Sequence, residues 1–277
     1  MAGASMNDIK ARIKSVKGTM QITRAMELVA TSKLRRAKER VEKTRAFSAV
    51  LKSAIAEIMC SEELSSSPYT ERREGKSLYI VIAGDRGLAG GYNANAFRLA
   101  AEGLSEDDAV LPVGKRAVEY YRHRGAEIFS DSFVYADEVG VGEAMCIAES
   151  VSDRFLSGEI AEVKLVYTDF TSMLTQTPRC VGLLPLEIEA EGTGSPEYDC
   201  DVEEMLGKIV PNYIGGVIYS ALCESLASEQ GARRTAMNAA NKNASEMIDS
   251  LMLSFNRARQ AVITQEITEI VSGAEAL

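Results

Sequence analysis

Apolar and small side chains recur every three or four positions through the first 58 residues of the chain. This repeat is typical of a helix that packs along a second helix, as in a coiled coil. All six prolines lie between positions 68 and 211, so both ends of the chain are expected to form long helices free of proline. The repeating positions are Ile9, Ile13, Val16, Met20, Thr23, Met26, Ala30, Leu34, Ala37, Val41, Thr44, Ser48, Leu51, Ile55 and Ile58.

The C-terminal segment shows the same repeat and predicts one long helix from about Glu203 to Ile270. Its positions are Met247, Leu251, Phe255, Ala258, Val262, Ile263, Ile267 and Ile270. Each helix exposes an apolar stripe to water, so we expect the two helices to pair. Because a compact middle segment separates them, the simplest pairing is antiparallel, with both chain ends near one tip.

Between the helical ends, predicted strands alternate with predicted helices, which is typical of a mostly parallel, Rossmann-like sheet. The predicted strands are 77–83, 109–113, 127–134, 163–167 and one within 179–188, and the predicted helices are 93–102, 115–124 and 142–156. A serine-rich segment that contains Pro68 is predicted to be a linker. The predicted organisation is an N-terminal helix over 1–60, a linker over 61–75, a Rossmann-like α/β domain over 76–200 and a C-terminal helix over 203–277.

The composition places the chain among globular proteins, with 46% hydrophobic and 26% charged residues. Its net charge of -9 argues against a surface that binds nucleic acid or anionic lipid throughout, although residues 1–58 carry an excess of basic side chains. No apolar run reaches the roughly 18 residues that a membrane span needs, and the first residues lack an apolar signal core. We therefore expect a soluble, cytoplasmic chain that does not insert into a membrane.

A glycine-rich turn follows the first predicted strand and precedes a predicted helix. Its residues are Gly84, Asp85, Arg86, Gly87, Gly90 and Gly91. Rossmann-like proteins bind phosphate at this place, since glycine lets backbone amides approach the anion. The spacing is neither GxGxxG nor GxxxxGK[ST], so a nucleotide-dependent enzyme with a helical appendage is the weaker alternative. The favoured interpretation is a structural turn in which Asp85 and Arg86 bond within the chain or to a partner.

Side chains for catalysis or metal binding do not form a recognisable pattern. His123, the only histidine, lies near the predicted end of a helix, where the helix dipole favours a cation. The five cysteines include no CxxC pair. We therefore predict no catalytic residue, no cofactor and no metal site. The basic run 33–40 has no interleaved aromatic residue, so a solvated helix face or an acidic protein partner explains it as well as nucleic acid does.

Three segments carry a family resemblance. They are 22–33 (ITRAMELVATSK), 84–93 (GDRGLAGGYN) and 256–273 (NRARQAVITQEITEIVSG). Together they resemble the gamma-subunit family of F-type, proton-translocating ATP synthases. The resemblance covers the whole chain in order, and the last segment is long enough to be specific.

The resemblance implies the fold class already predicted, α/β plus a long coiled coil, with a Rossmann-like α/β domain inserted between antiparallel terminal helices. It implies a central-stalk rotor shaft that transmits torque between a membrane c-ring and a catalytic ring of three alpha and three beta subunits. This rotation couples ATP synthesis or hydrolysis to proton transport. The implied chain is non-catalytic, its α/β domain contacts the epsilon subunit and the c-ring, and it lies peripherally on the cytoplasmic face of the bacterial cell membrane.

The resemblance also implies particular contact residues. Arg259 and Gln260 match positions that contact an acidic loop of the beta subunit, with Thr264, Glu266 and Glu269 nearby. Arg24 and Met26 match positions of the facing N-terminal helix that influence coupling efficiency. All seven are therefore predicted to be partner contacts that serve torque and coupling.

Overall fold

The computed structural model describes residues 6–59, 67–173, 175–187 and 202–275. Part of the predicted linker, 61–66, and the end of the predicted α/β segment, 188–200, lie outside the described residues. The chain divides into two compact units. Unit 1 consists of Met1–Val29 with Arg234–Leu277, and unit 2 of Ala30–Arg233. Two long helices, α1 (Met6–Met59) and α5 (Val202–Glu275), each contribute to both units.

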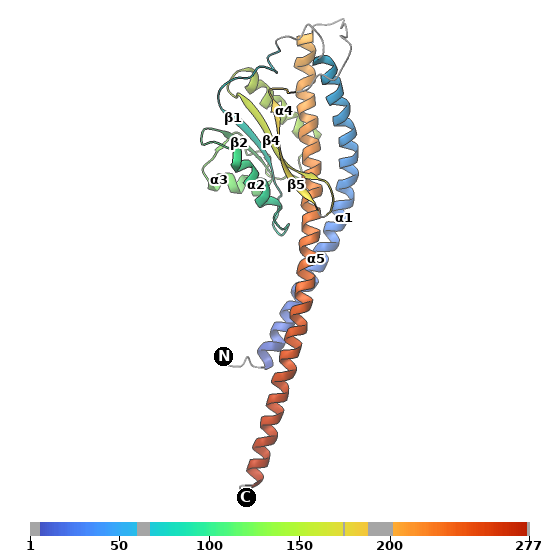
Figure 1. Cartoon of the computed structure of the whole chain (residues 1–277), viewed down its shortest axis with the longest axis vertical. Coiled ribbons are helices and arrows are strands. Elements are labelled where there is room, and N and C mark those ends of the chain that lie inside the picture. Colours follow the sequence, from blue (N-terminus) through green and yellow to red (C-terminus); the bar gives the residue numbers. More distant parts are fainter. Residues whose placement is uncertain (1–5, 60–66, 174, 188–201, 276–277) are drawn as a thin grey trace. The chain divides into compact units, whose positions relative to one another are not determined.

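Unit 1 is an antiparallel pair of helix segments (Figure 1). Thr23 Oγ1 of α1 lies 2.5 Å from Asn241 Oδ1 of α5, and Glu27 accepts hydrogen bonds from Asn238 and Asn241. All six predicted stripe positions from Ile9 to Met26 are buried or half-buried. The antiparallel pairing is therefore confirmed, and its seam contains amide and carboxylate groups as well as apolar side chains.

The stripe of α5 differs from its prediction in this unit. Met247 is 45% exposed, whereas its neighbour Ile248 is buried. The observed stripe alternates steps of four and three residues and passes through Met237, Asn241, Ala244, Ile248, Leu251, Phe255 and Ala258, which are all buried or half-buried. This register places Met247 on the solvent side of the helix.

The end of α5 continues past the start of α1 (Figure 1). Every residue from Arg259 to Ala274 is exposed, including the predicted stripe residues Val262, Ile263, Ile267 and Ile270. The expectation that the two helices begin and end near one tip is therefore wrong. The last turns of α5 have no second helix among the described residues of unit 1.

Unit 2 contains a five-stranded sheet in the order β3-β2-β1-β4-β5. The strands are β1 (Ser77–Ile82), β2 (Ala109–Val113), β3 (Glu127–Ile128), β4 (Glu162–Phe170) and β5 (Gln176–Leu184), and the helices between them are α2 (Tyr92–Gly103), α3 (Lys115–His123) and α4 (Val141–Leu156). The first four strands are parallel, and β5 runs antiparallel to β4. The mostly parallel, Rossmann-like sheet is confirmed.

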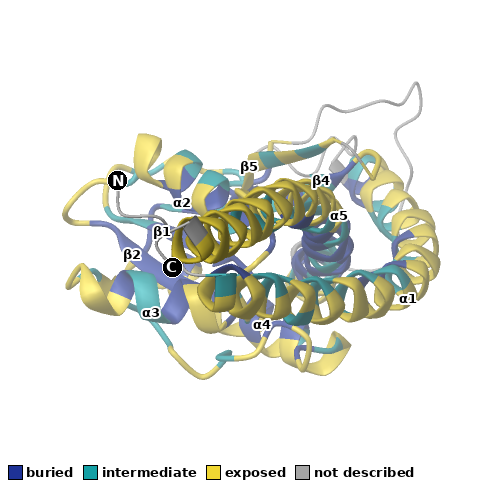
Figure 2. Cartoon of the chain, turned by 90° about the horizontal axis from the view of Figure 1, so that it is seen from below, coloured by how far each residue is buried: buried dark blue, intermediate teal, exposed yellow. Residues whose placement is uncertain are grey.

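Alternate residues of β1 serve two different cores, as the pleat of a strand requires. Leu78, Ile80 and Ile82 pack with α4, the first half of α5 and the end of α1. Tyr79 and Val81 pack with α2 and α3 on the opposite face. Because both faces are covered, the strand reads as a continuous apolar run. Figure 2 shows the corresponding burial along α5, which is dark blue only in part of its length.

Two sequence-based expectations need correction in unit 2. The predicted strand 127–134 is only two residues long, because the chain turns away after Phe129 N has bonded to Val110 O. The expectation that both terminal helices lack proline is also wrong, since Pro211 lies inside α5. Proline removes one backbone donor, and the ring crowds the carbonyl four residues earlier, which here belongs to Gly207. The helix continues through this position.

Candidate functional site

The predicted contact residues of α5 lie on its exposed end. Arg259, Gln260, Thr264, Glu266 and Glu269 are all exposed. Thr264 Oγ1 donates to Gln260 O at 2.9 Å, and Glu269 accepts from Gln265 Nε2 at 2.9 Å. The structure thus brings these residues together on one exposed helix segment with charged, amide and apolar side chains.

The two predicted residues of α1 lie elsewhere in unit 1. Arg24 is exposed and Met26 is half-buried in the helix seam. Thr23 contacts Asn241, and Arg259 lies five turns further along α5, about 27 Å at the usual rise per residue. The structure therefore does not bring Arg24 and Met26 together with the residues around Arg259.

The glycine turn is tied to the rest of unit 2 through Asp85. Its carboxylate accepts hydrogen bonds from the backbone N–H groups of Lys115, Ala136 and Asp137, at 3.2, 2.8 and 3.4 Å. Lys115 begins α3, and a helix start is where a bound anion is usually stabilised. Asp85 therefore fills from within the chain a position that a phosphate could use. Burial raises the pKa of the Asp85 carboxyl, and these backbone hydrogen bonds lower it in part.

Helix α5 packs onto the same turn through a buried ion pair. Arg233 Nη2 lies 2.6 Å from Glu229 Oε1, and it also donates to the carbonyl oxygens of Arg86 and Gly87 at 3.4 and 3.2 Å. Both charged side chains are buried, at 9% and 5% exposure. Burial raises the pKa of the Glu229 carboxyl, and Arg233 opposes that shift.

Sequence reasoning missed this pair. Glu229 and Arg233 are spaced for an ion pair on one helix side, but the same spacing occurs on solvated helices. Their neighbours Ala227, Ser228 and Gly231 are small, which suggests close packing around them. That pattern alone does not show which segment they contact.

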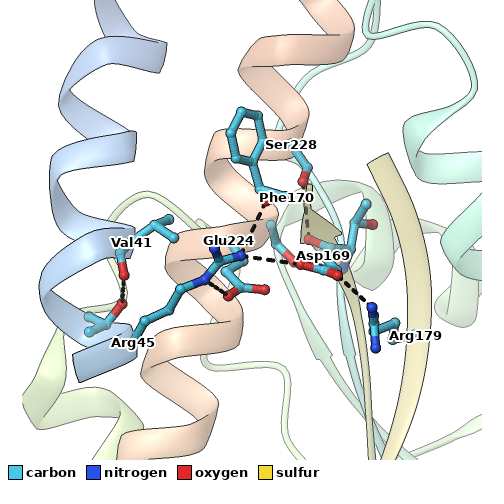
Figure 3. Close-up of polar contacts among 10 residues, drawn as sticks. Val41, Arg45, Asp169, Phe170, Arg179, Glu224 and Ser228 are labelled. Atoms are coloured by element: carbon cyan, nitrogen blue, oxygen red, sulfur yellow. Dashed lines mark hydrogen bonds and ion pairs between the residues drawn. The ribbon is translucent and has the colours of Figure 1, made fainter. Parts of the chain in front are cut away.

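A second charged cluster joins α1 and α5 to the sheet (Figure 3). Arg45 Nε donates to Glu224 Oε1 at 2.8 Å, and Arg45 Nη2 reaches Asp169 Oδ1 at 3.4 Å and Phe170 O at 3.2 Å. Asp169 also pairs with Arg179 of β5 at 2.8 Å. The hydrogen bond to Glu224 raises the pKa of Arg45, while burial raises that of Glu224. The cluster alternates in sign, so each carboxylate has a guanidinium partner.

A pocket of about 250 Å³ lies beside this cluster. Arg45 and Glu224 provide its charged wall, while Tyr167, Val181 and Val217 provide much of its apolar wall. The part of the chain that the structure describes holds no group of three His, Cys, Asp or Glu side chains placed for a metal ion. None of its described helices is long and apolar enough to cross a membrane.

The fold thus defines a class of protein in which a Rossmann-like domain is inserted between two long antiparallel helices. A sequence model described as ATP synthase matches residues 5–277. The ATP synthase gamma chain of Ruminococcus albus is 46% identical, with 98% of each chain covered. The ATP synthase gamma chain, sodium ion specific, of Acetobacterium woodii is 41% identical, with 99% of each chain covered. This chain belongs to the ATP synthase gamma chain family.

Solved structures with a similar fold come from mitochondrial ATP synthases. A chain in the central stalk and c-ring structure from Tetrahymena thermophila has a TM-score of 0.59 and 25% identity, covering 79% of this chain and 99% of that chain. A chain from the OSCP/F1/c-ring structure of Euglena gracilis has a TM-score of 0.66 and 18% identity, covering 98% of this chain and 94% of that chain. The second likeness concerns the fold alone.

Proposed function

We propose that this chain is the rotor shaft of a bacterial ATP synthase and transmits torque between the membrane c-ring and the catalytic ring of three alpha and three beta subunits. The observation that carries the proposal is the end of α5, where every residue from Arg259 to Ala274 is exposed. Apolar side chains such as Ile267 and Ile270 are costly to leave in water. A surrounding ring of partner subunits would cover them, in keeping with membership of the gamma chain family.

The shaft itself is proposed to be non-catalytic. The chemistry belongs to the assembled complex, and the chain presents different faces to otherwise equivalent catalytic sites as it turns. In support, the backbone amide of Gly84 in the glycine turn already bonds to Asn93, and that of Lys115 at the start of α3 already bonds to Asp85. This arrangement disfavours the alternative of a nucleotide-dependent enzyme.

Different segments of the chain are proposed to have different roles in the rotor. The terminal helices, 1–60 and 203–277, form the shaft, while 76–200, joined through 61–75, forms the foot that contacts the epsilon subunit and the c-ring. The assembly is proposed to lie on the cytoplasmic face of the cell membrane, with this chain peripheral to it. Coupling of this rotation to proton transport is proposed from the sequence resemblance to the gamma subunits of proton-translocating ATP synthases.

Arg259 and Gln260 are proposed to be the principal contact with an acidic loop of the beta subunit, with Thr264, Glu266 and Glu269 nearby. A guanidinium can form two parallel hydrogen bonds with a carboxylate, and the neighbouring amide adds a donor and an acceptor. Arg24 and Met26, which lie apart from this group, are proposed to influence coupling through a separate contact.

The test uses purified complexes in membrane vesicles. The double variant Arg259→Ala with Gln260→Ala should assemble but turn over ATP about tenfold more slowly, because losing a charge-assisted bond at the rate-limiting step has about this effect. The matched control, Asn256→Ala with Arg257→Ala, likewise removes one guanidinium and one carboxamide from neighbouring positions of the same helix. Unchanged turnover and pumping in the Arg259 variant would show that these residues are not a principal contact. A wild-type chain that fails to assemble with alpha and beta subunits would overturn the rotor function itself.

A further inference from the structure

Among the residues that the structure describes, seven buried polar residues lie in the half of α5 that belongs to unit 2. Five of them span about three turns, and we call these five the polar face of α5. They are Glu224, Ser225, Ser228, Glu229 and Arg233. Four of them bond to segments far away in sequence, and the fifth, Glu229, forms an ion pair with Arg233, which is one of those four. An ordinary core helix buries apolar side chains instead.

The two serines hold the same residue of β4. The backbone N–H of Thr168 donates to Ser225 Oγ at 3.0 Å, and Ser228 Oγ donates to Thr168 O at 3.1 Å. The Ser225 side chain also interacts with the hydroxyl of Tyr92, the first residue of α2. One turn of α5 is thereby attached to both the sheet and the start of the next helix.

The charged residues of the polar face bond to α1 and to the glycine turn. Glu224 accepts from Arg45 of α1, and Arg233 donates to the carbonyl oxygens of Arg86 and Gly87 in the glycine turn. Glu229 supports Arg233 through their 2.6 Å ion pair. The polar face therefore contacts α1, β4, α2 and the glycine turn, which are four separate parts of unit 2.

Directional bonds restrict a helix differently from apolar packing. Hydrophobic contact depends on area and has little directional preference, so an apolar helix can change its rotational setting at modest cost. Buried hydrogen bonds fail together if the helix turns, and each unpaired buried group is costly. Buried polar groups are known to select one register among competing packings in coiled coils.

We propose that the polar face of α5 locks the rotational setting of this helix against the α/β sheet and carries twisting load between the two. The inference rests on the proposed rotor function and deepens it by naming the residues that join shaft helix and foot domain. Without the lock, α5 turns against the sheet under load, and part of the rotation is lost.

The experiment measures the membrane potential generated per ATP hydrolysed, in vesicles that contain the full complex. Glu229→Gln with Arg233→Met keeps the side-chain volumes but removes the ion pair and the bonds to the glycine turn. We expect the complex to assemble and hydrolyse ATP, while the membrane potential generated per ATP falls about twofold or more. The reason is that losing one charge-assisted bond raises about tenfold the population of complexes in which α5 has turned against the sheet. The control, Glu204→Gln with Lys208→Met, removes an exposed pair of the same spacing on α5 and should leave the ratio unchanged.

A second variant covers the case in which the first does not assemble. Ser228→Ala deletes one hydroxyl without burying an unpaired charge, and it should lower the same ratio by a smaller factor. A merely structural role predicts less assembled complex but an unchanged ratio in the complex that forms, and that result in both variants overturns the proposal. Failure of the rotor function would show instead in the wild-type chain, which would then drive no pumping.

Discussion

A Cβ atom built on Gly84 would lie 2.8 Å from Cδ of Glu229, so the carboxylate group of α5 packs directly against the glycine turn. A methyl group at this position must displace a buried, paired side chain. We expect Gly84→Ala to destabilise the purified chain by about 1 to 3 kcal/mol, the usual cost of overpacking a filled site. Denaturant unfolding measures this change.

Gly142→Ala is the matched control for this prediction. Gly142 lies in α4 and has no neighbouring atom within 4 Å of an added Cβ. Alanine is the better helix former, so this variant should be neutral or stabilising by up to about 1 kcal/mol. Equal effects of the two substitutions would contradict the packing of Glu229 against Gly84.

The pH dependence of stability should report the burial of Glu229. Burial raises its pKa above the ordinary value of 4.5; Asp85 adds to the shift, while Arg233 and Lys33 oppose it. A carboxyl with a raised pKa in the folded state contributes stability that is present below the unfolded pKa and is lost as pH rises through the folded pKa. Glu229→Gln removes this titration. The free energy of unfolding of the wild type relative to the variant should therefore decrease as pH rises above 4.5; a constant difference would count against the raised pKa.

The helix pair of unit 1 should depend on Glu27. Its carboxylate accepts from Asn238 Nδ2 at 3.1 Å and from Asn241 Nδ2 at 2.9 Å. Glu27→Ala should lower the local opening free energy by about 1 to 3 kcal/mol, because two amide donors lose a charged acceptor. Amide hydrogen exchange of residues 6–29 measures the opening. Glu39→Ala, at an exposed position of α1, should leave that exchange unchanged.

The glycine turn should not bind ATP at micromolar concentration in the isolated chain. Gly84 N already donates to Asn93 Oδ1 at 2.9 Å, and the Asp85 carboxylate accepts a hydrogen bond from the first backbone amide of α3. A phosphate would have to displace these internal acceptors. Isothermal titration calorimetry with ATP checks the prediction, and micromolar binding that Gly87→Ala abolishes would contradict it.

Several features could be read from residue order because they depend on local periodicity. The stripe from Ile9 to Ile58 predicted the inner side of α1, and each of its positions is buried or half-buried. The strand at 109–113 was also predicted with its observed bounds. In the segment 127–134, the apolar residues indicated a longer strand, but pairing with β2 ends after two residues. Strand length depends on a neighbour that the pattern does not contain.

The sequence by itself determined the two long helices, the alternating α/β middle and the family, because periodicity and long segment matches are properties of residue order. Only the tertiary structure decided which residues join α5 to the sheet. Arg233 meets the carbonyl oxygen of Arg86 across 147 positions of sequence, and Ser225 meets Thr168 across 57. Such contacts depend on how α5 packs over the ends of β1 and β4. A buried ion pair and a solvated one have the same spacing along a helix, and only the packing around them tells the two apart.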